Sequence, residues 1–477
     1  MSDLGPERSL TGRDAACRAI ARALAGEEFV ADQIRSLRRD AALDVRDAGL
    51  ALEIAAGAVR HAITLEHVLS SVADYAHHRV APEIRAILYA AAYQVIYLDH
   101  IPVFAAVDEA VTLARRDVGV KPAGMVNAVL RRLSRAIAAR RVDWSCGSRS
   151  GGAVPPRLVR VAWNKACAFN VDIYPATTDR ARSTQTLAAA TGCRVEMLQQ
   201  LIDEHGLDAA ESAAWALAAP APTVVQRNAL KLAPAEFAAA VCTLDSQAEF
   251  LPPDAPNCAF LAESGPLIRS ELFTGGAAYI QDTTAQSAVA AVDAKPGERI
   301  LDLCAAPGGK SLGLAIAMEN RGEVIACDVA PERLARIREN RDRLGLTCIQ
   351  PRVIPEHSAL PREMTGFDAV LVDVPCTNSG VIARRPEARF AWNAENRAEL
   401  VQLQARLLRL AAGAIRPGGR LVYSTCSIDP AENASVVTQF AKSAPGGSVV
   451  QSAVTLPRWG PRLSDWRDGG FHAVLRR

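Results

Sequence analysis

Residues 301–310 read Leu-Asp-Leu-Cys-Ala-Ala-Pro-Gly-Gly-Lys, and this stretch decides the fold of the second half of the chain. The apolar run Arg299 to Cys304 predicts a short strand and Gly309 to Met318 predicts a helix, so the small residues between them form a strand-to-helix turn. Backbone N–H groups at the start of such a helix can approach a ligand closely. Asp328 ends the next predicted strand, Glu323 to Cys327, where an acid binds ribose hydroxyls in dinucleotide folds.

Strands and helices continue to alternate toward the C-terminus. The further predicted elements are helices over Pro331 to Leu344 and Ala398 to Ile415, and strands over Ala369 to Asp373 and Arg420 to Thr425. This alternation is typical of a doubly wound, Rossmann-like α/β sheet. Ligands bind such sheets at the C-terminal edge of the strands. Asp328, Asp373 and Cys426 all stand at strand ends, so we expect them to form one site.

Two cysteines follow the turn, in Asp-Val-Pro-Cys at 373–376 and in Ser-Thr-Cys-Ser at 424–427. C5 of cytosine is a poor nucleophile, and addition of a thiolate at C6 activates it. One cysteine would attack, and a second polar group nearby would help the C5 proton and the thiolate to leave. Asp373 is placed to hydrogen-bond N3 and to stabilise the charge that develops on the ring. The pattern predicts covalent methyl transfer to a pyrimidine.

Length and composition limit the class of protein. The 477 residues suffice for roughly three domains of ~150 residues each, and 49 % hydrophobic with 22 % charged residues indicates a globular chain. The 11 cysteines include no Cys-x-x-Cys pair, so we expect neither a disulfide framework nor a metal site, and a cytoplasmic location with reduced thiols. Residues 1–7 lack the features of a signal peptide, and no apolar run of ~18 residues predicts a membrane span.

The first part of the chain, residues 14–141, predicts an all-α bundle. Apolar residues recur at three-to-four spacing in Ala48 to Ile63, Ala81 to Leu98, Val103 to Arg116 and Met125 to Ala139. From Lys121 to Arg141 the chain carries six cations and no acid. This stretch suits nucleic-acid phosphates, and an ordinary solvated helix face is the alternative.

Changes in composition predict the domain boundaries. Glycine, serine and proline between Gly147 and Pro156 indicate an exposed linker. We therefore expect a helical domain over 1–142, a linker over 143–183, a helical and α+β subdomain over 184–280, and the catalytic domain over 281–477. The α+β part is expected to begin near Pro222.

Two family resemblances cover most of the chain. Residues 84–94, 98–102, 105–111 and 126–132 are similar to the NusB-like RNA-binding domain. From about Pro222 onward the chain resembles the RsmB/Sun group of RNA cytosine-5 methyltransferases. The matching motifs are Cys-Ala-Ala-Pro-Gly-Gly-Lys at 304–310, Gln-Asp at 281–282, Asp-Val-Pro-Cys-Thr-Asn-Ser-Gly at 373–380, Arg-Pro-Glu at 385–387, Tyr-Ser-Thr-Cys-Ser at 423–427 and Glu-Asn at 432–433.

The resemblance implies the chemistry of the site. Cys426 is expected to be the nucleophile, Cys376 to help release the product and Asp373 to hold N3, with S-adenosyl-L-methionine as cofactor. The residues expected to bind the cofactor are Cys304, Ala305, Ala306, Pro307, Gly308, Gly309, Lys310, Asp328, Arg333, Glu356 and Asp373. Glu356 stands where the family usually has an aspartate. The implied product is 5-methylcytosine in small-subunit (16S) ribosomal RNA, made by a monomer that uses no metal and no membrane.

Several alternatives stay open at this stage. Either Lys310 or a helix beginning after Pro430 could lower the pKa of Cys426. Gln281 and Asp282 resemble the segment that contacts the target base, or form a polar turn. The candidates for binding RNA follow the Pro-Cys motif and are Arg384, Arg385, Arg389 and Trp392. For Trp392 a position in the core is the alternative. A transfer RNA cytosine-5 methyltransferase and a non-catalytic RNA-binding ribosome-assembly factor are the rival functions.

Overall fold

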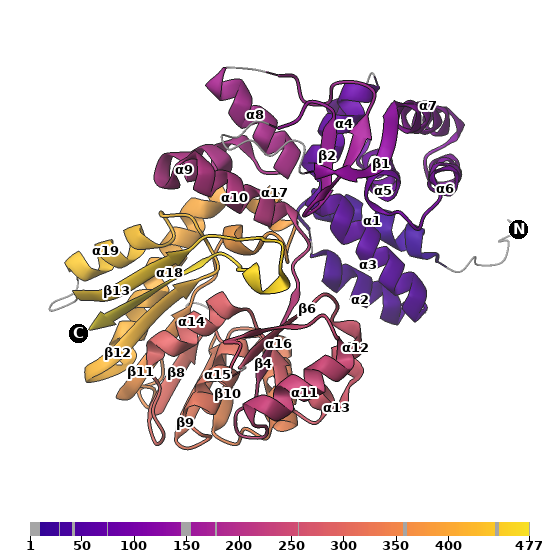
Figure 1. Ribbon diagram of the computed structural model, residues 1–477. Helices are drawn as coiled ribbons and strands as arrows, with labels where there is room; N and C mark the ends of the chain where they lie inside the picture. Colours follow the sequence, from indigo (N-terminus) through magenta and orange to yellow (C-terminus); the bar gives the residue numbers. More distant parts are fainter. Residues whose placement is uncertain are drawn as a thin grey trace, which may run out of the picture. The chain divides into compact units, whose positions relative to one another are not determined.

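The computed structural model describes residues 10–27, 29–40, 43–73, 75–144, 154–176, 179–255, 257–355, 360–443 and 448–476 (Figure 1). The chain divides into two compact units. The first comprises Met1–Ala219 and Ile382–Ala391, and the second comprises Pro220–Val381 and Trp392–Arg477. The ten residues from Ile382 therefore pack with the N-terminal unit. The finer boundaries expected at 142, 183 and 280 stay predictions.

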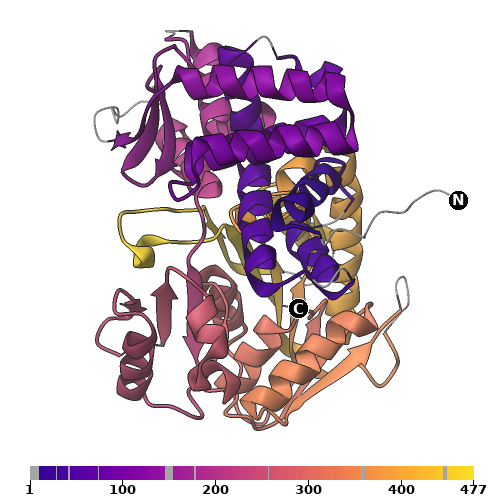
Figure 2. The same ribbon diagram turned by 90° about the vertical axis from the view of Figure 1, so that its right-hand side faces the viewer.

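The first unit begins with the expected helical bundle, drawn in indigo to purple in Figure 2. Its helices are α1 (Gly12–Leu24), α2 (Val30–Asp40), α3 (Val45–Arg60), α4 (Ala62–Val72), the 3₁₀ turn η1 (His77–Arg79), α5 (Pro82–Tyr97), α6 (Val103–Asp117) and α7 (Val120–Ala136). Helix α5 is buried on nearly all sides from Ile84 onward, so it forms the centre of the bundle. Pro82 occupies its first turn, where a missing N–H costs nothing.

None of the described helices is by itself long and apolar enough to cross a membrane. Only α3 and α4 pass a length-and-composition test as a pair, with a bend of 73° between them.

A small sheet follows the bundle, in a region where the sequence predicts a linker. Strands β1 (Ile137–Asp143), β2 (Leu158–Ala162) and β3 (Lys165–Phe169) pair antiparallel in the order β1-β3-β2. The guanidinium of Arg160 lies 4.9–5.3 Å from the ring centres of Trp144, Trp163 and Trp215. Such cation–π contacts fix the hairpin. The expected linker is thus partly a folded sheet, and its stretch 147–152 lies outside the described residues.

Helices α8 (Arg180–Thr191), α9 (Val195–His205) and α10 (Leu207–Ala218) complete this part of the first unit, and the short α17 (Ala388–Ala391) also belongs to it. The helices expected after residue 184 are therefore present.

The basic stretch has two roles. Arg140 and Arg141 donate to the backbone carbonyls of Leu98 and Tyr97 at the end of α5, where a cation stabilises the helix dipole. Arg140 is partly buried by these contacts, whereas Arg141 is exposed and also pairs with Asp99 at 2.5 Å. The remaining four cations of the stretch are exposed on α7: Lys121, Arg131, Arg132 and Arg135.

The second unit opens with the expected α+β subdomain. Its strands β4 (Thr223–Arg227), β5 (Glu249–Leu251), β6 (Cys258–Leu261) and β7 (Ala278–Ile280) form an antiparallel sheet of order β5-β6-β4-β7. Its helices are α11 (Pro234–Leu244), α12 (Gly265–Arg269) and α13 (Glu271–Thr274). Phe237 and Val241 of α11 pack with Val225 of β4 in one apolar cluster.

The main sheet has seven strands in the order β10-β9-β8-β11-β12-β14-β13. These are β8 (Arg299–Leu303), β9 (Glu323–Asp328), β10 (Ile349–Val353), β11 (Phe367–Asp373), β12 (Ile415–Thr425), β13 (Ser448–Thr455) and β14 (Gly470–Arg476). The first five pair in parallel, and β14 and β13 are antiparallel additions at one edge. The helices and 3₁₀ turns are α14 (Thr283–Val292), α15 (Gly309–Ala317), α16 (Pro331–Leu344), η3 (Ser379–Val381), α18 (Ala394–Ala414), α19 (Ala434–Ser443) and η4 (Leu463–Asp465).

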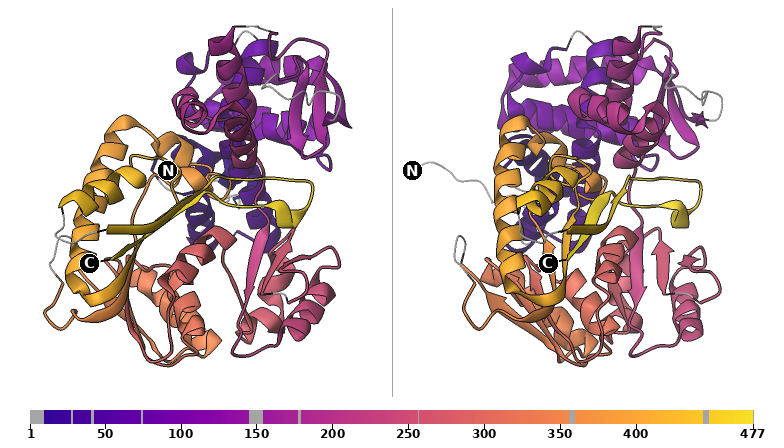
Figure 3. Two further views of the ribbon diagram at one scale, coloured as in Figure 1. Left: turned by 60° about the vertical axis from the view of Figure 1, so that its left-hand side comes forward. Right: turned by 90° about the vertical axis from the view of Figure 1, so that its left-hand side faces the viewer.

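Helices cover both faces of the main sheet (Figure 3), and alternate residues of its strands face opposite layers. On one face Leu301, Val370 and Leu421 join Leu408 of α18 and Val436 of α19. On the other face the next residues along these strands, Ile300, Leu371 and Val422, join the apolar residues of α14, α15 and α16. The sheet is thus doubly wound, and strand order reverses between β8 and β11, where such folds bind ligands.

Two glycines of α3 test the packing of the bundle. A Cβ on Gly57 would overlap the Tyr93 ring, whereas one on Gly49 would meet nothing within 4 Å. We expect Gly57→Ala to destabilise the protein by about 1–3 kcal/mol because the core is overpacked. Gly49→Ala is the matched control, and it should be neutral or stabilising by up to ~1 kcal/mol because alanine favours helix. Thermal unfolding followed by circular dichroism measures both, and equal Tm shifts in the two variants would contradict this packing.

Candidate active site

Strand register brings the two cysteines together. Strands β11 and β12 are parallel neighbours in which Asp373 lies opposite Ser424, so the loops that follow them leave the sheet side by side. Cys376 and Cys426, 50 residues apart in sequence, place their sulfur atoms 3.1 Å apart. The Sγ of Cys426 also lies 3.1 Å from Oδ1 of Asn378. Asp373 ends β11 three residues before Cys376.

The surroundings of Cys376 favour a neutral thiol. Its pKa is raised well above the usual value by the hydrogen bond with Cys426, by burial and by the negative charges of Cys426 and Glu432. A neutral thiol can donate to the sulfur of Cys426. Burial also raises the pKa of Cys327 to about 12, so that cysteine is an inert core residue.

Lys310 supplies positive charge to the site. It lies in the first turn of α15, and its Nζ is 2.7 Å from Oδ2 of Asp373. Burial acts to lower the pKa of Lys310, but attraction to Asp373, Cys426 and Asp302 outweighs it and the net pKa is raised. Lys310 therefore stays charged and interacts with Cys426. The helix expected after Pro430 is α19, which begins at Ala434.

A small cavity adjoins the reacting groups. It measures about 50 Å³, and its lining includes Asp282, Lys310, Cys426 and Phe471. A space of this size holds about one or two waters. Asp282 is part of this lining, and its contact with the target base stays a prediction.

Asp328 and Arg333 hold the glycine-rich turn. Oδ2 of Asp328 accepts from the N–H of Ala306 at 3.1 Å, and Arg333 donates to the carbonyl of Ala306 at 2.6 Å. Arg333 also pairs with Asp328 at 3.4 Å. Gly308 has φ +108°, and a Cβ there would lie 2.8 Å from Ile337, so only glycine suits this position. The turn, its acid and its arginine thus form one assembly at the switch point of the sheet.

Two buried polar groups beside the turn were not among the predicted cofactor residues. Asp302 is fully buried in β8; its Oδ2 accepts from Ser311, and its Oδ1 has no partner among the described residues. An acid inside an apolar strand was the available signal. Gln281 is also buried, with its side-chain oxygen unpartnered within the described ranges and its amide close to Gly309.

Two of the residues expected to bind RNA lie in the interior. Arg389 is 2 % exposed and donates to the carbonyls of Pro386 and Gly192, and burial lowers its pKa to about 10. The prediction that Arg389 contacts RNA directly is therefore wrong, because its guanidinium is buried and hydrogen-bonded within the first unit. Trp392 is also buried, which favours its core alternative, and Arg397 lies 5.3 Å from its ring centre.

Two further predictions have different outcomes. Arg384 and Arg385 are exposed and stay candidates for RNA binding. Glu356 lies outside the described residues, so its cofactor role stays a prediction. No group of three or more histidines, cysteines or acids within the described parts of the chain could hold a metal ion.

Comparisons with known proteins identify the family. Residues 289–457 match the family model of 16S rRNA methyltransferase RsmB/F, and residues 11–135 match that of the NusB family. The chain is 29 % identical over 438 residues to the probable ribosomal RNA small subunit methyltransferase B of Bacillus subtilis (strain 168), covering 91 % of this chain and 88 % of the relative. To the ribosomal RNA small subunit methyltransferase B of Vibrio vulnificus (strain YJ016) it is 30 % identical, over 90 % and 91 % of the two chains.

A solved structure shares the fold over the same length. The crystal structure of PH0851 matches with a TM-score of 0.72 and 21 % identity, covering 98 % of this chain and 100 % of that one, and at this identity the likeness concerns the fold alone. The two domain matches and the nearly full-length relatives agree with a helical bundle followed by a doubly wound sheet. The chain belongs to the ribosomal RNA small subunit methyltransferase B family, in which a NusB domain precedes an RsmB/F methyltransferase domain.

Proposed function

We propose that this protein uses S-adenosyl-L-methionine to form 5-methylcytosine in small-subunit (16S) ribosomal RNA, through a covalent bond between Cys426 and C6 of the base. The observation that carries the proposal is the 3.1 Å contact of two cysteine sulfurs beside the paired Lys310 and Asp373. The names of the relatives and the NusB match support ribosomal RNA as the substrate. Its working form is a cytoplasmic monomer.

The residues act in sequence on the base. Lys310 stabilises the Cys426 thiolate, whose sulfur forms a bond to C6 as N3 takes up a proton from solvent, and the Asp373 carboxylate accepts a hydrogen bond from the resulting N3–H. The bound cofactor supplies the methyl group that C5 accepts. A general base then removes the proton from C5. The electron pair of the C5–H bond restores the C5–C6 double bond, and the C6–S bond breaks with its electron pair on the sulfur of Cys426. Cys376, as a thiol, donates a hydrogen bond to the departing sulfur.

The cofactor residues fit an adenosyl group with an amino acid tail. The glycine turn exposes backbone near the start of α15, and Asp328 stands at the end of β9, the place for ribose hydroxyls. The unpartnered Oδ1 of Asp302 can accept from an ammonium group at the same edge. Ala305, Ala306 and Cys304 complete the turn around these two acids.

Covalent trapping tests the reaction. We expect Cys376→Ala, given S-adenosyl-L-methionine and 16S ribosomal RNA, to accumulate a protein–RNA adduct on a denaturing gel because release is slowed. Adding Cys426→Ala should abolish the adduct, and Cys426→Ala alone should lower methyl incorporation more than about 10³-fold. Cys348→Ala, in a buried cysteine away from the site, is the matched control and should behave as wild type.

The same assay separates the rival functions. If the wild-type protein methylates transfer RNA and not 16S ribosomal RNA, the substrate is transfer RNA and the proposed substrate is wrong. Binding of RNA without incorporation into either would favour a non-catalytic assembly factor. An adduct that persists in the double variant would remove Cys426 as the nucleophile.

The buried Asp302 gives a pH-dependent stability. Burial raises its pKa from 3.8 to about 7, and repulsion from Asp373 adds to this. Between these values the folded state keeps a proton that the unfolded state has lost, so the free energy of unfolding falls as pH rises through this window. We expect this fall to be smaller in Asp302→Asn by about 2 kcal/mol between pH 5 and 7, in urea unfolding without cofactor. The exposed Asp203→Asn is the control, and equal slopes in all three proteins would contradict the buried proton.

A further inference from the structure

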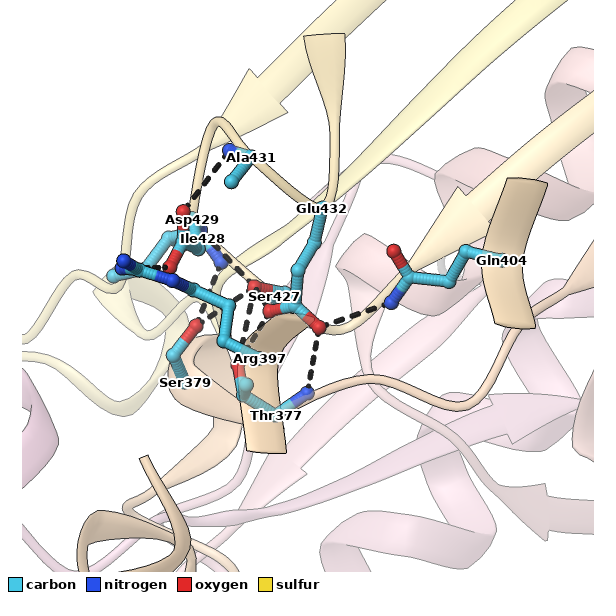
Figure 4. Close-up of polar contacts among 9 residues, drawn as sticks. All are labelled: Thr377, Ser379, Arg397, Gln404, Ser427, Ile428, Asp429, Ala431 and Glu432. Carbon is cyan, nitrogen blue, oxygen red and sulfur yellow. Dashed lines mark hydrogen bonds and ion pairs between the residues drawn. The ribbon is translucent and has the colours of Figure 1, made fainter. Parts of the chain in front are cut away.

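A buried carboxylate joins the loops that carry the two cysteines (Figure 4). Glu432 lies in the turn before α19 and is fully buried. Its Oε1 accepts from the N–H of Thr377 and from Nε2 of Gln404, each at 2.9 Å. Its Oε2 accepts from the hydroxyls of Thr377 and Ser427, each at 2.5 Å. The side chain therefore receives four hydrogen bonds, the number that two carboxylate oxygens can accept.

The donors are the immediate neighbours of the reacting groups. Thr377 follows Cys376, and Ser427 follows Cys426, so one carboxylate is tied to both loops one residue from each sulfur. The Ser379 hydroxyl adds a second tie, 2.9 Å from the hydroxyl of Ser427.

Helix α18 anchors this arrangement to the sheet. Nε2 of Gln404, which is buried in α18, bridges Oε1 of Glu432 and the carbonyl of Pro375, 2.9 Å from each. Shifting Glu432 would therefore move both ends of the Pro-Cys loop.

Besides holding the loops, Glu432 acts on the cysteines through its negative charge. Its four partners are neutral groups, so they satisfy the carboxylate without cancelling its charge. The field of this charge acts on Cys376 and favours its protonated form. Lys310 lines the same small cavity as Cys426, and its pKa is raised in part by attraction to that cysteine. The negative charge of Glu432 therefore acts on Cys376, and the positive charge of Lys310 interacts with Cys426, whose sulfur is 3.1 Å from that of Cys376.

We propose that Glu432 is a positioning residue for the reaction proposed above: its carboxylate holds the Cys376 and Cys426 loops in contact, and its negative charge acts on Cys376. Because only a thiol can donate a hydrogen bond to the departing Cys426 sulfur, the carboxylate acts on product release through Cys376. The predicted effect on turnover rests on the proposed methyl transfer. The effect of Glu432 on Cys376 does not depend on that reaction and can be measured without RNA.

Two substitutions separate charge from geometry. Glu432→Gln keeps the length of the side chain; its amide oxygen can retain the bonds from Thr377 N and Gln404, while the two hydroxyls rotate to accept from the amide nitrogen. Glu432→Asp keeps the charge but withdraws the carboxylate by one methylene. Glu298→Gln removes a half-buried carboxylate that pairs with Arg420 at the opposite ends of the strands, and it is the matched control for stability.

The pH profile of turnover distinguishes the variants. In Glu432→Gln we expect the alkaline limb of kcat to move down by about one pH unit, because Cys376 ionises more readily without the negative field. The RNA adduct should accumulate above that pH, with KM for RNA within about twofold of wild type. Glu432→Asp should lower kcat about tenfold at every pH and leave the alkaline limb in place. Loss of folded protein alone would move neither the limb nor the adduct fraction.

A measurement without RNA completes the test. Iodoacetamide labelling across pH, read at the Cys376 peptide by mass spectrometry, should shift to lower pH in Glu432→Gln and stay unchanged in Glu432→Asp and Glu298→Gln. An unshifted Cys376 profile, or a Glu432→Gln enzyme with the wild-type pH profile, would overturn the role of Glu432. Absence of methyl transfer by wild type, together with a shifted Cys376 profile, would instead refute the proposed function and leave the electrostatic role standing.

Discussion

The parallel pairing of β11 with β12 is the constraint on which the site depends. With Asp373 opposite Ser424, the two loops leave the same sheet edge one strand apart, and their cysteines meet at 3.1 Å. A one-residue slip of this register would turn every side chain of β12 to the other face. Because Leu421 and Tyr423 are buried on one face and Val422 on the other, packing of both helical layers holds the register. The geometry of the sulfurs is therefore fixed by core residues that take no part in the chemistry.

Nearby charges then give the two cysteines, Cys376 and Cys426, different surroundings. Lys310 carries positive charge toward Cys426 and is itself kept charged by Asp373, whereas Cys376 lies in the negative field of Glu432. At short range in a buried site such fields act with little screening. In the proposed mechanism this arrangement gives the two cysteines separate tasks, since one bonds to the base and the other stays protonated.

Most of the catalytic domain could be predicted from the sequence because its signals are local. The apolar runs of β8 and β9 end at glycine turns or acids, so the predicted strands match the observed ones within one residue. The sheet of β1, β2 and β3 could not be predicted in the same way. Its strands pair residues far apart in sequence, such as 137 with 169. Its centre is Arg160 among tryptophan rings, and from the sequence alone an arginine is expected at the surface.

Other features depend on distant partners. Arg389 is buried because it donates to the carbonyl of Gly192, 197 residues away, and no local pattern marks that contact. The raised pKa of Asp302 results from complete burial, which the sequence of β8 suggests only by placing an acid among apolar residues. Glu432 could be recognised by its family motif, but its position between the two cysteine loops follows from the fold.

The most direct test of the central claim is to map the bond between protein and base. RNA containing 5-fluorocytosine retains the adduct, because fluorine at C5 cannot leave as the proton does. After incubation of wild-type protein with this RNA and S-adenosyl-L-methionine, digestion and mass spectrometry identify the modified peptide. We predict a methylated fluorocytosine nucleotide on the peptide that contains Cys426; the same group on the Cys376 peptide, or on neither, would contradict the account.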